Sequence, residues 1–192
     1  MRVQKLVPVL LLTIVALSGG LLAQTSKGAP ETFTANAHVQ GGNTGAGAAT
    51  VQVHIQRYTP EFDRTSVETA LKTGGFRSFV AALKKAPEVG SVTVGDQKFP
   101  IRWAREQPAA KGRTIVVVTS EPMFFVGGGR VEAKPREGFE VGLIQLQVDD
   151  VGLGNGTMAA AARVKPGGET GVQVEDYADK PIKLVTVVRK TQ

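Results

Sequence analysis

Apolar and polar residues alternate along most of the chain after residue 47, and the period of the pattern changes once. Between Ala48 and Tyr58, the apolar residues Val51, Val53 and Ile55 are separated by single polar residues. A period of two is typical of a strand with one buried face. After Val89, segments bounded by turn residues predict further strands at Ser91–Val94, Lys98–Arg105, Thr114–Thr119, Glu140–Asp149, Thr157–Lys165, Thr170–Tyr177 and Ile182–Arg189.

The segment Thr59–Pro87 has a helical period instead. Around Phe79 and Leu83, apolar residues recur at intervals of three and four, which places them on one face of a helix. Gly74-Gly75 separates this stretch from an earlier helical pattern. We therefore expect a hairpin of two short helices, inserted after the first strand, with an apolar stripe that covers one face of a sheet.

Together these elements predict an α+β fold: an antiparallel curled sheet or open β-barrel, a meander of about 7–9 strands, with one inserted helical hairpin. Thr114–Thr119 is apolar on both faces, so we expect it to be a central strand covered on both sides. Strict alternation in the preceding strand places Phe99, Ile101 and Trp103 on one face together with Arg105.

The N-terminus has the pattern of a secretory signal peptide. Arg2 and Lys5 precede the uncharged run Leu6–Leu22, and the small residue Ala23 follows. We expect cleavage after Ala23, although a run of about 17 apolar residues is also close to the length of an uncleaved membrane anchor. The expected organisation is a signal peptide at residues 1–23, a flexible leader at 24–47 in which Thr32–Val39 adds an edge strand, and one domain at 48–192.

The amino-acid composition limits the cellular compartments in which we expect the protein. An exported chain without cysteine must be stabilised by packing alone, which is ordinary for a bacterial envelope protein. We therefore expect a periplasmic or secreted bacterial protein. The net charge of +6 is spread along the chain rather than concentrated in one tract. It is compatible with peripheral contact with an anionic envelope surface, and nucleic acid is not an expected partner in this compartment.

No catalytic motif stands out. The chain has neither a nucleophile elbow nor an HExxH sequence, and it has only two histidines, His38 and His54. A catalytic metal needs about three protein ligands, so we expect no metal and no cofactor. The run Asp149–Gly156 lacks the oxygen-bearing side chains of a calcium loop and predicts a glycine-rich hairpin bend. A non-catalytic protein is the better expectation.

The segment Glu121–Arg130 is unusual because consecutive apolar side chains are followed by three glycines and a cation. It is either a buried strand or an apolar loop at a mouth or interface. The indole of Trp103 lies near the cation of Arg105 in the sequence. If Arg105 faces inward, its charge needs a carboxylate or a ligand anion as partner. The candidate residues for binding a ligand or partner are Met123, Phe124, Phe125, Arg130, Trp103 and Arg105.

Three stretches, Ala70–Gly75, Gly112–Thr119 and Asp149–Ala161, resemble exported bacterial domains whose function is uncharacterised. The resemblance covers most of the expected mature domain. It implies export from a bacterial cell, and it implies no activity, cofactor or site residue.

These observations leave three hypotheses for the function. The first is an exported envelope protein that binds a partner or a small apolar ligand without catalysis. The second is a periplasmic hydrolase whose site is assembled from residues distant in sequence, and the third is a structural envelope component. A pocket with converging acids favours the hydrolase, an apolar pocket favours ligand binding, and a filled interior favours the structural role.

Overall fold

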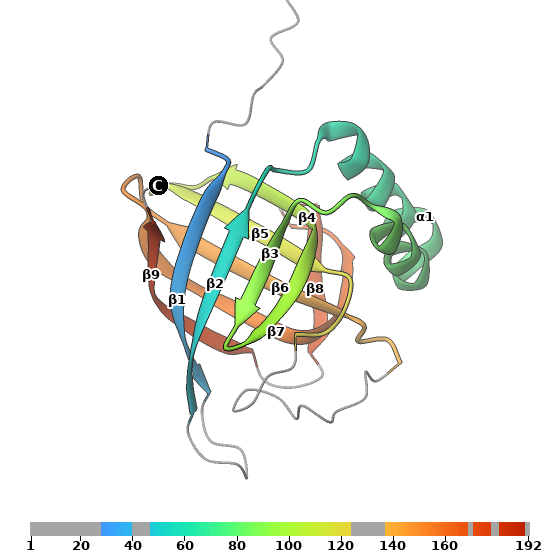
Figure 1. The fold of residues 1–192 in the computed structure, drawn as a ribbon. Coiled ribbons are helices and arrows are strands. Elements are labelled where there is room, and N and C mark those ends of the chain that lie inside the picture. The colour runs from blue at the N-terminus through green and yellow to red at the C-terminus, as the bar shows by residue number, and fades with distance from the viewer. Residues whose placement is uncertain (1–27, 40–46, 124–136, 169–170, 178–180, 191–192) are drawn as a thin grey trace, which may run out of the picture.

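The computed structural model describes residues 28–39, 47–123, 137–168, 171–177 and 181–190, which form nine antiparallel strands and one helical element (Figure 1). In chain order these are β1 (Glu31–Val39), β2 (Gly47–Ile55), α1 (Glu61–Lys85), β3 (Gly90–Val94), β4 (Gln97–Pro108), β5 (Arg113–Thr119), β6 (Val141–Val148), β7 (Leu153–Pro166), β8 (Val172–Tyr177) and β9 (Ile182–Lys190).

The strands close into a barrel. Their order is β6-β5-β4-β3-β2-β1-β9-β7-β8, and β6 also pairs with β7, so eight strands form a ring and β8 extends from β7. The expectation of a β-rich antiparallel sheet is confirmed, but the barrel is closed rather than open. β1 to β6 follow one another as a meander, while β9 breaks that order by lying between β1 and β7.

The first strand corrects the expected start of the folded domain. β1 lies inside the range that the sequence pattern assigned to a flexible leader, and Thr32–Val39 was expected only as an edge strand. In the structure β1 pairs with β2 on one side and with β9 on the other, so it is an internal strand of the ring. Residues 31–39 therefore belong to the barrel.

Inward-facing side chains form an apolar core inside the described part of the barrel. Alternate residues of every strand of the ring point inward, and together they form one contiguous buried cluster. An eight-stranded barrel is just wide enough for side chains to fill it. The largest interior side chains that are almost fully buried are Phe33, Ile55, Ile101, Ile115, Met123, Ile144, Leu146 and Met158.

A second apolar cluster lies outside the barrel wall, beneath α1. The helical element contributes Val67, Leu71, Phe79, Val80 and Leu83 to it. β5 contributes to both clusters, because Ile115 and Val117 point inward whereas Val116 and Val118 point outward toward α1. The prediction of a strand covered on both faces is thus confirmed.

The expected common face of Phe99, Ile101 and Trp103 is wrong. A register shift between Ile101 and Trp103 in the pairing of β4 with β5 inserts one extra residue into β4. Phe99 and Ile101 therefore point into the barrel, while Trp103 belongs to the outer cluster under α1. Arg105 keeps the face of Trp103, which is the outer one.

The helical element is broken at Gly75, whose φ of 68° and ψ of −165° are not helical. Asp63 and Ser66 of the first segment line the same groove as Ala82 and Lys85 of the second. In a straight helix, residues so far apart in sequence would be separated by roughly 25–30 Å. The two segments therefore lie side by side, in the position expected for the helical hairpin (Figure 1).

The glycine-rich segment after β6 differs from its prediction. The turn is short and ends at Gly152, and Gly154 and Gly156 lie within β7. A Cβ atom at Gly154 would approach the carbonyl oxygen of Gln147 to 1.8 Å. The glycines therefore allow β7 to lie close to its neighbours β6 and β9. They do not form a wide bend.

Within the described part of the chain, no helix is both long and apolar enough to cross a bilayer.

Phe79→Ala should destabilise the protein by about 3–5 kcal/mol, because the side chain is fully buried between α1 and the barrel. Phe62→Ala is the matched control, since Phe62 lies in the same helical element and is 85% exposed. Urea denaturation of both variants measures the difference. A control variant as unstable as Phe79→Ala would contradict the packing described here.

Candidate functional site at the barrel mouth

The six residues predicted from the sequence are not brought together by the fold. Met123 is fully buried in the interior cluster, and its backbone N–H donates to the carbonyl of Ala160 at 2.7 Å. Trp103 is fully buried on the other side of the barrel wall. Phe124, Phe125 and Arg130 lie outside the described residues.

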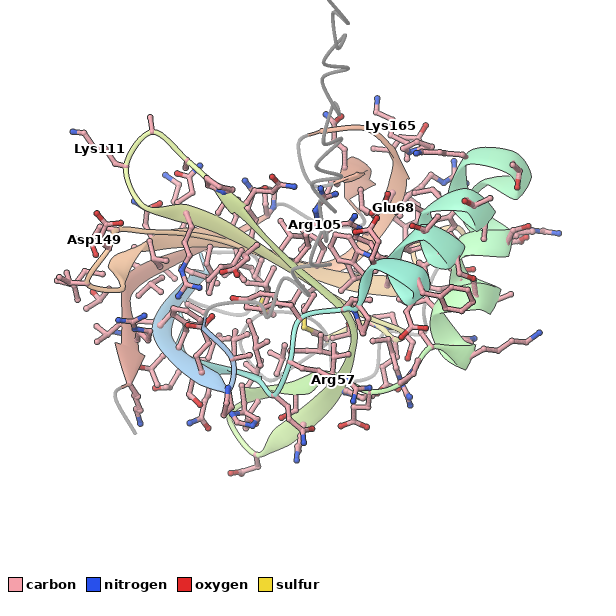
Figure 2. The ribbon with its side chains drawn as sticks, turned by 90° about the horizontal axis from the view of Figure 1, so that it is seen from above. Arg57, Glu68, Arg105, Lys111, Asp149 and Lys165 are labelled. Atoms are coloured by element: carbon pink, nitrogen blue, oxygen red, sulfur yellow. The ribbon has the colours of Figure 1, made fainter. Side chains whose placement is uncertain are left out.

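Arg105 forms an ion pair with a carboxylate on α1. Its Nη1 atom lies 3.6 Å from Oε1 of Glu68 on α1, and Figure 2 shows both side chains between the barrel and α1. Burial, and then the neighbouring charge of Arg64, lower the pKa of Arg105. Glu68 also lies 3.7 Å from Nε of Arg64. This group of charges fastens α1 to the outside of the barrel.

A different polar group, which sequence reasoning missed, occupies one end of the barrel. We call this end the mouth: β1, β5 and β7 begin there, and β2, β4, β6 and β9 end there. Four side chains form what we call the mouth cluster: Glu31 at the start of β1, Tyr58 after β2, Glu106 near the end of β4 and Arg113 at the start of β5.

Arg113 is the centre of the mouth cluster. Its two terminal nitrogens donate to both oxygens of Glu31, at 3.0 and 2.6 Å, in a bidentate pair. Nη1 also donates to Glu106 at 2.6 Å. The guanidinium carbon lies 5.8 Å from the centre of the Phe33 ring, within range of a cation–π contact. One cation thus joins β1, β4 and β5.

Tyr58 completes the cluster from the segment that leads to α1. Its hydroxyl donates to Glu31, whose carboxylate is only 3% exposed. Burial, and then this hydrogen bond to Glu31, raise the pKa of Tyr58 far above its ordinary value. Burial alone would lower the pKa of Arg113, but the hydrogen bonds to Glu31 and Glu106 outweigh it and raise that pKa. The ionised Arg113 and the neutral phenol are therefore the stable forms.

An open depression of about 390 Å³ lies beside the mouth cluster, lined by Gly112, Arg113, Asp149, Asp150 and Arg189. Its walls are tight turns. Oδ1 of Asp149 accepts hydrogen bonds from the backbone N–H groups of Val151 and Leu153, at 3.1 and 2.8 Å.

The neighbouring glycines hold these turns together. Gly152 has a φ of 87°, and its carbonyl accepts a hydrogen bond from the N–H of Arg189 at 2.9 Å. Gly112 has a φ of 75°, and a Cβ atom there would lie 2.1 Å from the carbonyl oxygen of Val148. The β4–β5 and β6–β7 turns are therefore packed against each other beside the depression.

The polar side chains of the mouth cluster hydrogen-bond to one another. Both carboxylates of the mouth cluster accept hydrogen bonds from Arg113, and the phenol donates to Glu31. The described residues contain no group of three or more His, Asp or Glu placed to hold a metal ion. His54, on the outer face of β2, pairs with the hydroxyl of Thr32 at 2.9 Å instead.

A signal for the mouth cluster is present in the sequence. Arg113 precedes Ile115 by two residues and Glu31 precedes Phe33 by two, so both charges hold inward positions of their strands. A charge in an inward position at a strand end needs a partner from a neighbouring strand. Extending the alternating pattern two positions before Phe33 and Ile115 would have identified Glu31 and Arg113.

Comparisons of the chain with models of known protein families, with curated proteins and with solved structures find no match.

Arg113→Leu should destabilise the protein by about 3–5 kcal/mol, because it leaves the buried carboxylate of Glu31 without its cation. Arg77→Leu is the matched control: Arg77 also pairs with a glutamate, Glu137, but both side chains are more than 80% exposed. Urea denaturation should show a large loss for the first variant and little change for the second. Equal effects would mean that burial of the pair is unimportant.

The stability of the protein should fall as the pH rises above the ordinary tyrosine pKa of 10.0. Because the pKa of Tyr58 is raised in the folded state, only the unfolded chain loses this proton between the two values, and stability drops by about 1.4 kcal/mol per pH unit. Tyr58→Phe removes the titrating group, so its free energy of unfolding should decline less steeply. Urea denaturation of both proteins between pH 9 and 11 measures the slopes, and parallel slopes would exclude Tyr58 as the cause.

Proposed function

We propose that this chain is an exported envelope protein that binds a macromolecular partner without catalysing a reaction. The observation that supports the proposal is the interior of the barrel: inward-facing side chains of all eight strands of the ring pack together in one buried apolar cluster. A barrel that carries a small apolar ligand keeps an internal cavity for it. The buried interior cluster therefore argues against uptake of a small apolar ligand. It is also the interior expected of a structural envelope component, and such a component likewise contacts its partners through its outer surface.

The mouth cluster bears on the hydrolase alternative. Glu31 and Glu106 both bond to Nη1 of Arg113, so two carboxylates do converge at one end of the barrel. A hydrolase, however, needs an acid or base that is free to exchange a proton with a substrate. Here Glu31 is almost fully buried and shared between Arg113 and Tyr58. This arrangement supports a structural role for Glu31.

The expected localisation, periplasmic or secreted in bacteria, rests on the N-terminal pattern of cations, apolar run and small residue. Residues 31–39 are part of the barrel, so the folded domain starts only a few residues after Ala23. A chain cleaved at Ala23 retains every strand that the structure describes.

Expression of the full chain in a bacterial host with two membranes tests the proposal. The protein should appear in the periplasm or medium with an intact mass that begins at Gln24, and Ala23→Phe should block this cleavage because the small residue is lost. Native mass spectrometry of the exported protein should show no retained small apolar molecule. A full-length chain in the membrane fraction would support the anchor alternative, and a co-purified small ligand would contradict surface binding.

A further inference from the structure

Three large apolar side chains are strongly exposed among the described residues: two lie in the β6–β7 turn at the mouth, and the third lies in the first turn of α1, outside the barrel wall. Phe62 is 85% exposed, Val151 69% and Leu153 50%. Val151 and Leu153 belong to the β6–β7 turn beside the depression. Phe62 lies in the first turn of α1, four residues after Tyr58 of the mouth cluster.

Single exposed apolar residues are ordinary, but among the described residues the three strongly exposed ones gather in two segments, the β6–β7 turn and the first turn of α1. Figure 1 shows the start of β1 and the first turn of α1 at the same upper level. Figure 2 looks down on that level and places Lys111 and Asp149 on the side of the barrel away from α1. The apolar residues thus stand at two separated points of one end, an arrangement that suits a flat partner.

The β6–β7 turn presents its apolar pair on a rigid support. Asp149 holds the backbone of Val151 and Leu153, and Arg189 packs against Gly152 between them. A preorganised turn loses little conformational entropy when it binds. The exposed side chains are therefore presented at low entropic cost.

The chain outside the described residues indicates what the mouth faces. Gly28 lies against Arg113, so the N-terminal segment reaches the barrel at the mouth. The apolar run Leu6–Leu22 ends only a few residues earlier in the sequence. Even fully extended, the intervening chain spans only on the order of 20 Å. If the barrel folds before this run is cleaved and leaves the bilayer, the mouth is held close to the membrane surface.

The charges at the mouth are nearly balanced. The mouth cluster has two carboxylates and one guanidinium. The other charged side chains described near this end are the cations Arg57, Arg64, Lys111, Arg189 and Lys190 and the acids Glu61, Asp63, Glu88, Asp149 and Asp150. This composition does not favour attraction to an anionic surface, and it leaves the apolar side chains as the source of affinity.

We infer that the mouth docks on the surface of a lipid bilayer, with Phe62, Val151 and Leu153 entering the boundary between headgroups and acyl chains. The inference rests on the proposed export of the chain and names the partner of the proposed surface. Phe and Leu are typical residues of this boundary in proteins that lie on membranes.

The absence of cysteine allows single-site labelling of the exported chain that begins at Gln24. Val151→Cys carries an environment-sensitive fluorophore at the mouth. Asp96→Cys carries the same fluorophore in the exposed β3–β4 turn, at the opposite end of the barrel. With zwitterionic phosphatidylcholine vesicles, the Val151 label should shift to shorter wavelength, as in an apolar environment, while the Asp96 label should not.

Co-sedimentation with the same vesicles supplies the affinity without a label. Replacing Phe62, Val151 and Leu153 together by serine should weaken binding about tenfold or more. Circular dichroism and thermal melting should be unchanged, because all three side chains are exposed in the folded protein. The binding of the unlabelled chain should also change little between low and high salt.

Several outcomes would overturn the inference. Equal shifts of both labels would mean non-specific adsorption, and binding that needs anionic lipid and disappears in high salt would mean charge attraction. A photocrosslinker at position 151 that captures a protein rather than lipid in cells would make the mouth a protein interface. A failure to bind vesicles, with export and cleavage intact, would overturn bilayer docking and leave the proposed export and surface binding standing.

Discussion

The bidentate ion pair between Arg113 and Glu31 holds the mouth of the barrel together. Much of the remaining structure depends on this pair. It joins the start of β1 to the start of β5, across strands that are not neighbours in the ring. Through Tyr58 it also sets where the chain leaves β2 for α1, and through Glu106 it sets the end of β4. A charge pair inside a barrel is costly unless its hydrogen bonds are satisfied, and here each member has further partners.

Barrel closure then divides the apolar residues into two sets. The inward set must fill a space of fixed width, and it does so with aliphatic and aromatic side chains of the chain itself. The outward set is apolar where α1 and β8 cover it, and there it includes Trp103 and the outward residues of β5. Along β1 and β2 the outer wall carries hydroxyl, amide and imidazole side chains such as Thr34, Gln52 and His54.

Much of the fold follows from local pattern, because strands and helices differ in period. The alternation of Val51, Val53 and Ile55 and the helical spacing around Phe79 each indicate the element that forms. The bulge that turns Trp103 outward left no such signal, since an extra residue in one strand is defined only by its partner strand. Barrel closure was not evident from the sequence either, because it also depends on a partner strand. The pairing of β1 with β9 joins the two ends of the described chain.

The candidate site was harder to predict than the fold. The sequence drew attention to the most apolar loop and to an indole near a cation, yet Met123 and Trp103 are packing residues and Arg105 fastens α1. The residues that gather at the mouth are separated by up to 82 positions in the chain. Their proximity depends on the order of strands in the ring, which no local pattern encodes.

The position of β9 in the ring also has a kinetic consequence. β1, near the start of the chain, can complete its pairing only when residues 182–190 are available, because β9 lies between β1 and β7. Contacts that span almost the whole chain make folding slow, since a long loop must close before the pairing is formed. A nascent chain that still lacks its last strand therefore cannot close the barrel. The barrel therefore stays open until residues 182–190 are in place, which is compatible with the proposed export of the chain before it folds.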